Sequence, residues 1–193
     1  MSQRKTLLTN ARVVLGPAGT DQGEWDIAIS AGKIESLTKA LPGTRDASAA
    51  QIDCRGLVAC PGFVDLHIHG GKGSDFMDAT EEDFRVIAGY HAAGGTTAYF
   101  PTTASDSLEA LTASIDLADR CRQQRSGAVE ILGVHVEGPY FNPNKNGCHD
   151  PAWVRPLSKA ENRAYLDRAH IIRRITLAPE LPGAREFIRD LTH

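Results

Sequence analysis

Two histidines, His67 and His69, stand two residues apart at the end of an apolar run that begins at Pro61. Alternate residues of a β-strand project to the same face, about 6.7 Å apart, so both imidazoles can converge on one metal ion. Asp65 lies two residues before His67 and projects to the same face of the strand. The residues of opposite parity are apolar and are expected to pack: Val64, Leu66 and Ile68. The spacing therefore predicts a strand with one chemical face and one packing face.

A second segment, Ile131–Glu137, repeats this pattern. His135 and Glu137 share one face, and the acid falls at the carboxyl end of the expected strand. In α/β barrels this end of the strands carries the active site. The two histidines of the first segment could therefore meet His135 and Glu137 at one sheet edge and offer imidazole and carboxylate ligands suited to Zn²⁺ or Fe²⁺.

Each of these residues also has a purely structural interpretation. An isolated His-x-His in a strand is more often structural than a pair of metal ligands. The position of His67 and His69 at a strand end, before a glycine-rich loop, nevertheless favours metal binding. Glu137 could instead be a buried acid that accepts hydrogen bonds from loop amides. His135 lies one pleat deeper, and we expect it to orient Glu137 rather than to bind metal. His91 and His170 are expected to pack on helices.

A long polar loop, Gly138–Pro151, follows Glu137 directly. Long loops at the carboxyl face of a barrel usually bind substrate. His149 could donate a hydrogen bond to a substrate hydroxyl or phosphate. Lys145 is more simply a solvated side chain.

The elements that must position these residues fall into two parts. Residues 1–59 show short β-like runs between turn formers, which predict a small antiparallel β unit. From residue 60 strands alternate with helices, which predicts parallel βα units. The expected strands are 63–69, 96–103, 128–137 and 175–180. Helices are expected near Thr80, which forms a capping box with Asp83, near Asp106, which opens a helix with Glu109, and near Lys159 and Ala184. Four βα units make the N-terminal half of a (β/α)₈ barrel, so the fold class is α/β with a preceding β-sandwich-like unit.

Composition sets the broad class of protein. The chain has 193 residues, is 41% hydrophobic and carries a formal charge of −3, which argues against nucleic-acid or membrane-surface binding. The N-terminus shows no signal peptide or membrane span, so a cytoplasmic location is expected. The four cysteines lack CxxC spacing, which disfavours a structural zinc site.

Taken together, the segments PGFVDLHIHG, HVEGPYFNP, GCHDP and TLAPE resemble the N-acetylglucosamine-6-phosphate deacetylases of the amidohydrolase superfamily. The resemblance implies that Glu137 is a metal ligand and that His67 and His69 hold a second divalent ion, zinc or iron, in members that keep both histidines. It implies that Cys148, through its backbone, and His149 contact the amino-sugar phosphate. The implied reaction is metal-assisted hydrolysis of the acetamide to glucosamine 6-phosphate and acetate, in a homodimer when full length.

Members of that family are roughly twice as long as this chain. The resemblance places the general acid/base aspartate, two further histidine ligands and most phosphate contacts in the half that is missing here. We therefore expect no catalytic acid/base in these 193 residues, an incomplete β unit, and no activity from the isolated chain. The alternatives are another amidohydrolase of dihydroorotase or allantoinase type, and a non-catalytic half-barrel that pairs with a second chain.

Overall fold

The computed structural model describes residues 5–14, 16, 23–41, 49–125 and 127–192. The chain divides into two compact units, Met1–Pro61 and Gly62–His193. Each unit has its own hydrophobic clusters. None of the helices among the described residues has the length and apolar character needed to cross a membrane.

The first unit is a small mixed sheet. Its strands are β1 (Thr6–Val13), β2 (Trp25–Ser30), β3 (Lys33–Lys39), β4 (Ala50–Asp53) and β5 (Val58–Ala59). The pairs β1–β2 and β2–β3 are antiparallel, whereas β4 and β5 both run parallel to β1. The prediction of a purely antiparallel unit is therefore wrong. Strand β4 pairs with β1 in parallel, with Ala50 opposite Thr6.

The hairpin between β2 and β3 follows local backbone chemistry. Ala31 and Gly32 form the two-residue turn, with φ of 53° and 71°. A tight hairpin turn of type I′ needs positive φ at both central positions, which glycine adopts without strain. Ser30 and Lys33 consequently pair across the turn.

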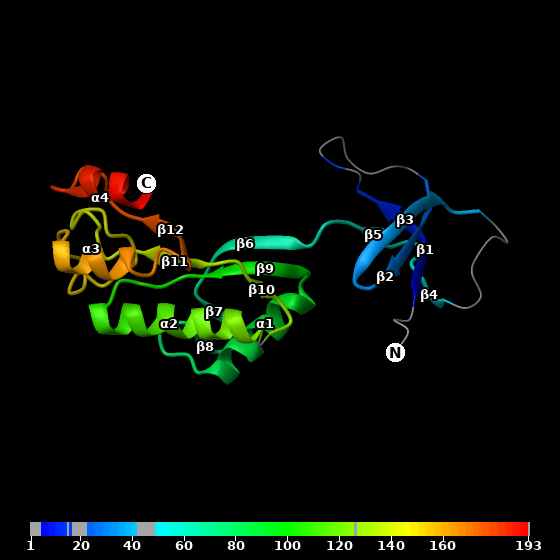
Figure 1. Cartoon of the computed structure of the whole chain (residues 1–193), viewed down its shortest axis with the longest axis horizontal. Helices are drawn as coiled ribbons and strands as arrows, with labels where there is room; N and C mark the ends of the chain where they lie inside the picture. The colour runs from blue at the N-terminus through cyan, green and yellow to red at the C-terminus, as the bar shows by residue number, and fades with distance from the viewer. Residues whose placement is uncertain (1–4, 15, 17–22, 42–48, 126, 193) are drawn as a thin grey trace. The chain divides into compact units, whose positions relative to one another are not determined.

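In the second unit parallel strands alternate with helices (Figure 1). Its elements are β6 (Phe63–Ile68), β7 (Gly70–Gly71), β8 (Ser74–Asp75), α1 (Glu81–Ala93), β9 (Thr96–Pro101), α2 (Leu108–Gln124), β10 (Glu130–Ile131), β11 (Val134–Glu137), α3 (Lys159–Leu166), β12 (Ile172–Thr176) and α4 (Ala184–Thr192). Strands β6, β9 and β10 form one parallel sheet, and β11 and β12 form another. A bridge between Thr102 and His135 links them, so the strands follow one another in chain order.

The third predicted strand, 128–137, is interrupted between β10 and β11. Gly133 lies at the break, where an added Cβ would sit 2.3 Å from Cγ of Arg173 and 2.8 Å from the carbonyl oxygen of Ile171. The chain can approach the start of β12 this closely only because residue 133 is glycine. The fourth strand also begins and ends earlier than predicted, at Ile172 and Thr176.

Helices α1 and α2 pack on β9 and β10 and bury the core of the unit. Phe76, Phe84 and Tyr99 meet there, with ring centroids 4.9 and 5.8 Å apart for the pairs Phe76–Phe84 and Phe76–Tyr99. The predicted capping box of α1 is present, since Thr80 accepts from the Asp83 amide and the Asp83 carboxylate accepts from the Thr80 amide.

Two local predictions are wrong. Helix α2 is capped by Ser107 rather than Asp106, with the Ser107 hydroxyl accepting from the Ala110 amide. On β6, Val64 and Leu66 were expected to pack, yet they are 53% and 48% exposed. Among the described strands β6 has a neighbour on one side only, so part of its apolar face stays open.

Candidate metal centre

The two histidines of the His-x-His motif meet at the end of β6. His67 lies in the strand and His69 just beyond it, so both side chains leave the same face. Their Nε2 atoms are 3.2 Å apart. The side chains are 40% and 38% exposed, which leaves the pair open to solvent and to a ligand.

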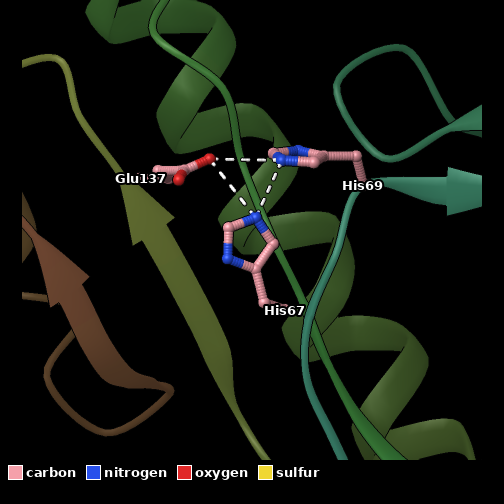
Figure 2. Close-up of side chains that lie close together, drawn as sticks. All are labelled: His67, His69 and Glu137. Carbon is pink, nitrogen blue, oxygen red and sulfur yellow. Dashed lines mark hydrogen bonds and ion pairs between the residues drawn. The ribbon is translucent and has the colours of Figure 1, made fainter. Parts of the chain in front are cut away.

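Glu137 joins them from the end of β11 (Figure 2). Its Oε2 atom lies 3.5 Å from Nε2 of His67 and 3.2 Å from Nε2 of His69. These three residues form the group of His, Cys, Asp or Glu side chains that could hold a metal ion among the described residues. Asp65, which shares the parity of the histidines, instead accepts a hydrogen bond from the backbone amide of His67 at 3.1 Å.

The spacing of the three ligand atoms fits a single ion. Around a tetrahedral Zn²⁺ with bonds of about 2.0–2.1 Å, neighbouring ligand atoms are separated by about 3.3 Å. The three observed separations run from 3.2 to 3.5 Å and so match one face of such a tetrahedron. The donor set, two imidazoles and one carboxylate, is one that zinc and iron both accept.

His135 lies beneath this group and is fully buried. Its Nδ1 lies 3.3 Å from the Thr102 hydroxyl and its Nε2 lies 2.8 Å from the Thr176 hydroxyl. Burial, followed by the charges of Arg174 and of neighbouring histidines, lowers the pKa of His135 to about 4, so the ring is neutral near pH 7. The described contacts of this ring are with the threonines and with the edge of His67, at 5.0 Å between centroids, rather than with Glu137.

His149 reaches the group from the long loop. Its Nε2 lies 3.5 Å from Oε2 of Glu137, and its Nδ1 accepts a hydrogen bond of 3.1 Å from the backbone amide of Ser105. The neighbouring Cys148 is exposed. Lys145 is also exposed, as expected for a side chain that is simply solvated.

Sequence reasoning did not find the hydroxyl residues that support the centre. Thr102 accepts from the Ile68 amide, and Thr103 accepts from the Glu137 amide, so both fix backbone next to a candidate ligand. Both are buried. The signal that could have identified them is the Thr-Thr pair at the carboxyl end of the second strand, level with the two motifs.

A buried ion pair anchors the loop that carries His149. Arg155 donates to Glu161 with Nε, at 3.1 Å, and with Nη2. Its Nη1 also donates to the carbonyl of Asp106, at 2.8 Å, which ties the end of the loop to the start of α2. Tyr165 donates to the same carboxylate at 3.2 Å.

We expect Arg155→Met to lower the free energy of unfolding by about 2–3 kcal/mol. Removing one partner of a fully buried pair typically costs 3–5 kcal/mol, and the Arg155 side chain keeps 26% exposure while Glu161 keeps 7%. Urea unfolding measures the change. Arg163→Met is the matched control, because Arg163 pairs with Asp167 where both are exposed and should cost less than about 0.5 kcal/mol. Equal losses in the two variants would contradict the buried-pair account.

Comparisons with known proteins point to one group of enzymes. The chain is 37% identical over 134 residues to an N-acetylgalactosamine-6-phosphate deacetylase of Escherichia coli O157:H7, covering 68% of this chain and 35% of that protein. It is 32% identical over 193 residues to an N-acetylglucosamine-6-phosphate deacetylase of Bos taurus, covering 95% of this chain and 46% of that protein. No protein-family model matches the chain.

Solved structures agree. The N-acetylglucosamine-6-phosphate deacetylase of Pasteurella multocida superposes with a TM-score of 0.84 and 25% identity, covering 96% of this chain and 48% of that one. A mutant deacetylase from Mycobacterium smegmatis, in complex with N-acetyl-D-glucosamine-6-phosphate, superposes with a TM-score of 0.79 and 27% identity, covering 98% and 47%. The chain thus spans about half the length of the relatives that it matches.

Proposed function

Because the chain belongs to the family of N-acetylglucosamine-6-phosphate deacetylases and spans about half of their length, we propose that it forms part of a metal-dependent site for hydrolysis of N-acetylglucosamine 6-phosphate. The products are glucosamine 6-phosphate and acetate. One observation carries the proposal: His67, His69 and Glu137, from strands β6 and β11, converge on a single point.

In this proposal the three side chains hold one divalent ion. Each histidine presents Nε2 to that point, so each ring carries its hydrogen on Nδ1, and Glu137 supplies the negative charge. An ion held there would polarise the acetamide carbonyl and lower the pKa of water at the site towards neutrality. A second ion would need ligands beyond these three.

We propose that the second unit is the first half of a (β/α)₈ barrel. Its parallel strands follow one another in chain order and are separated by helices, as in barrel enzymes. Polar side chains gather where these strands end: His67, His69, Thr102, Thr103, Glu137 and Thr176. That edge is where barrel enzymes place their catalytic groups.

The loop after β11 is proposed to receive the sugar. His149 is held beside Glu137, and the Phe141 ring packs against it with centroids 4.6 Å apart. Cys148, an exposed residue, lies next to His149 in the chain. An imidazole N–H and backbone groups are donors and acceptors suited to sugar hydroxyls, and a ring such as Phe141 shields them from water.

The E. coli relative is named for the galactosamine epimer, which makes N-acetylgalactosamine 6-phosphate the second candidate substrate. The test is acetate release from both sugar phosphates by a polypeptide that contains this chain and has the length of its relatives. We expect the glucosamine epimer to react faster by at least about tenfold, because a site that hydrogen-bonds a hydroxyl rejects its misplaced counterpart. Preference for the other epimer supports the second candidate, and hydrolysis of neither refutes both.

A further inference from the structure

Helix α1 contacts the short hairpin that follows the His-x-His motif. Strands β7 and β8 form this hairpin directly after His69, and α1 packs against both of them. His91, in the last turn of α1, has its Nε2 atom 3.0 Å from the carbonyl oxygen of Gly70. A carbonyl oxygen can only accept, so Nε2 carries the hydrogen and donates it. Besides packing, the ring therefore makes a directed polar contact one residue from a candidate metal ligand.

The hydrogen bonds around His69 show what this contact adds. Three consecutive carbonyls, of residues 68–70, each accept a hydrogen bond. The donors to the first two are the backbone amides of Thr102 and Phe76, at 2.9 and 2.8 Å. The donor to the third is the His91 side chain. His69 itself lies between β6 and β7 and belongs to neither strand, so these contacts hold the backbone on both sides of it.

Two glycines let the His91 ring approach the hairpin this closely. A Cβ added at Gly71 would lie 3.0 Å from Nε2 of His91 and 3.0 Å from Cδ1 of Tyr90. A Cβ added at Gly70 would lie 2.1 Å from the carbonyl oxygen of Ser74, across the hairpin. Glycine is the residue that permits such close approach to backbone. The glycine pair after the two histidines thus leaves room both for the helix and for the turn.

The other end of α1 holds the second strand of the hairpin. Ser74 donates from Oγ to Oδ1 of Asp83 at 2.8 Å, and Oδ2 of the same carboxylate accepts from the Thr80 amide at 2.7 Å. Hydrogen bonds from Thr80, and then from Ser74, lower the pKa of Asp83 to about 2, so this carboxylate stays charged near pH 7. Helix α1 therefore holds the hairpin at two points, and the contact from His91 is the one beside His69.

We propose that His91 is a positioning residue for the candidate metal centre, and that its Nε2–H acts through the Gly70 carbonyl on the backbone that carries His69. A metal ligand must be held close to its binding geometry by the groups around it, because disorder in the ligand weakens binding. The effect on zinc binding rests on the proposed metal site. The effect on the His69 backbone does not, because it concerns the protein without metal.

The backbone effect is tested by ¹⁵N relaxation on the metal-free chain. A rigid backbone gives an amide order parameter of about 0.85, and a flexible one gives less than about 0.6. We expect the His69 amide to be rigid in the unsubstituted chain and to fall towards about 0.6 in His91→Leu, which fills the space but has no donor. His91→Gln keeps an N–H near the position of Nε2 and should keep this amide rigid. A rigid His69 amide in His91→Leu overturns the proposal.

Zn²⁺ affinity then tests whether the effect reaches the site. We expect His91→Leu to lower the affinity by roughly tenfold, the lower end of the range for contacts that orient metal ligands, and His91→Gln to lower it less. His170→Leu is the matched control and should leave the affinity unchanged, because it removes an imidazole that pairs with Asp119 of α2 rather than with the hairpin. Equal losses in the two His91 variants overturn the role of the N–H.

The route through His69 is tested by combining substitutions. In a chain that carries His69→Ala, His91→Leu should cost no further zinc affinity, because the ligand that it positions is absent. In a chain that carries His67→Ala, it should still cost roughly tenfold. Equal costs in the two backgrounds indicate a general loss of structure and overturn the positioning role. Absence of zinc binding by the unsubstituted chain refutes the proposed metal site instead, and the order parameters then still decide whether His91 holds the His69 backbone.

Discussion

Replacing Glu137 by glutamine should lower the Zn²⁺ affinity of this chain by at least about 100-fold. Loss of a hydrogen bond to a metal ligand usually costs 10–100-fold, and loss of the ligand's own charge costs more. Glu137 is the carboxylate of the group, and its Oε2 is the atom that both histidines face. Without it, two imidazoles remain in the group and no carboxylate.

His67→Ala and His69→Ala should each produce losses of similar size, because the three atoms are expected to share one ion. Competition with a chromophoric zinc chelator gives the affinities, and titration to saturation gives the stoichiometry, for which we expect one ion per chain. Glu130→Gln, at an exposed glutamate of β10, is the matched control for Glu137→Gln. Unchanged affinity in all three site variants would place the metal elsewhere. Two ions per chain would contradict the single-ion arrangement.

The second expected result concerns turnover. A polypeptide of these 193 residues alone should release no acetate from N-acetylglucosamine 6-phosphate with Zn²⁺ present, whereas a polypeptide of the relatives' length should. The described residues bring three candidate ligands and His149 together, and Glu137 is the carboxylate among them. A carboxylate that binds the ion cannot also act as a free general base, so a further acid is needed.

The open edges of the parallel strands lead to the same expectation. Among the described strands β6 and β12 each have a neighbour on one side, and Phe63, Val64 and Leu66 of β6 are exposed. Such edges leave backbone donors and acceptors without the partners that barrel closure provides. Both assays use a host that lacks its own deacetylase, and Glu137→Gln in the longer polypeptide is the control for contamination. Acetate release by the short chain that disappears on Glu137→Gln would contradict this account of which residues are needed.

Much of the site could be predicted because strand parity is local. The two-residue spacing in His-x-His and His-x-Glu places each pair on one face of a strand, whatever the strand packs against. The segments around these pairs carry the resemblance to the deacetylases, and the comparisons support it. Helix caps are local too, which is why the box at Thr80 and Asp83 was predicted correctly.

Parity did not determine what His135 contacts. It shares a face with Glu137, but alternate residues of one strand face neighbours on other strands rather than each other. Its partners, Thr102 and Thr176, come from the ends of β9 and β12. The parallel strands of the first unit were missed for a related reason, since the pairing of β1 with β4 joins segments more than 40 residues apart.

The amino-acid sequence by itself determined which residues are candidate metal ligands and which faces of their strands they occupy, because both depend on side-chain chemistry and a two-residue period. Only the tertiary structure decided that Glu137 meets His67 and His69 at distances suited to one ion. It also placed Ser105 and Phe141 on His149, and the His91 ring on the Gly70 carbonyl. Those contacts join four separate segments of the chain, and no local period relates segments that meet only through folding.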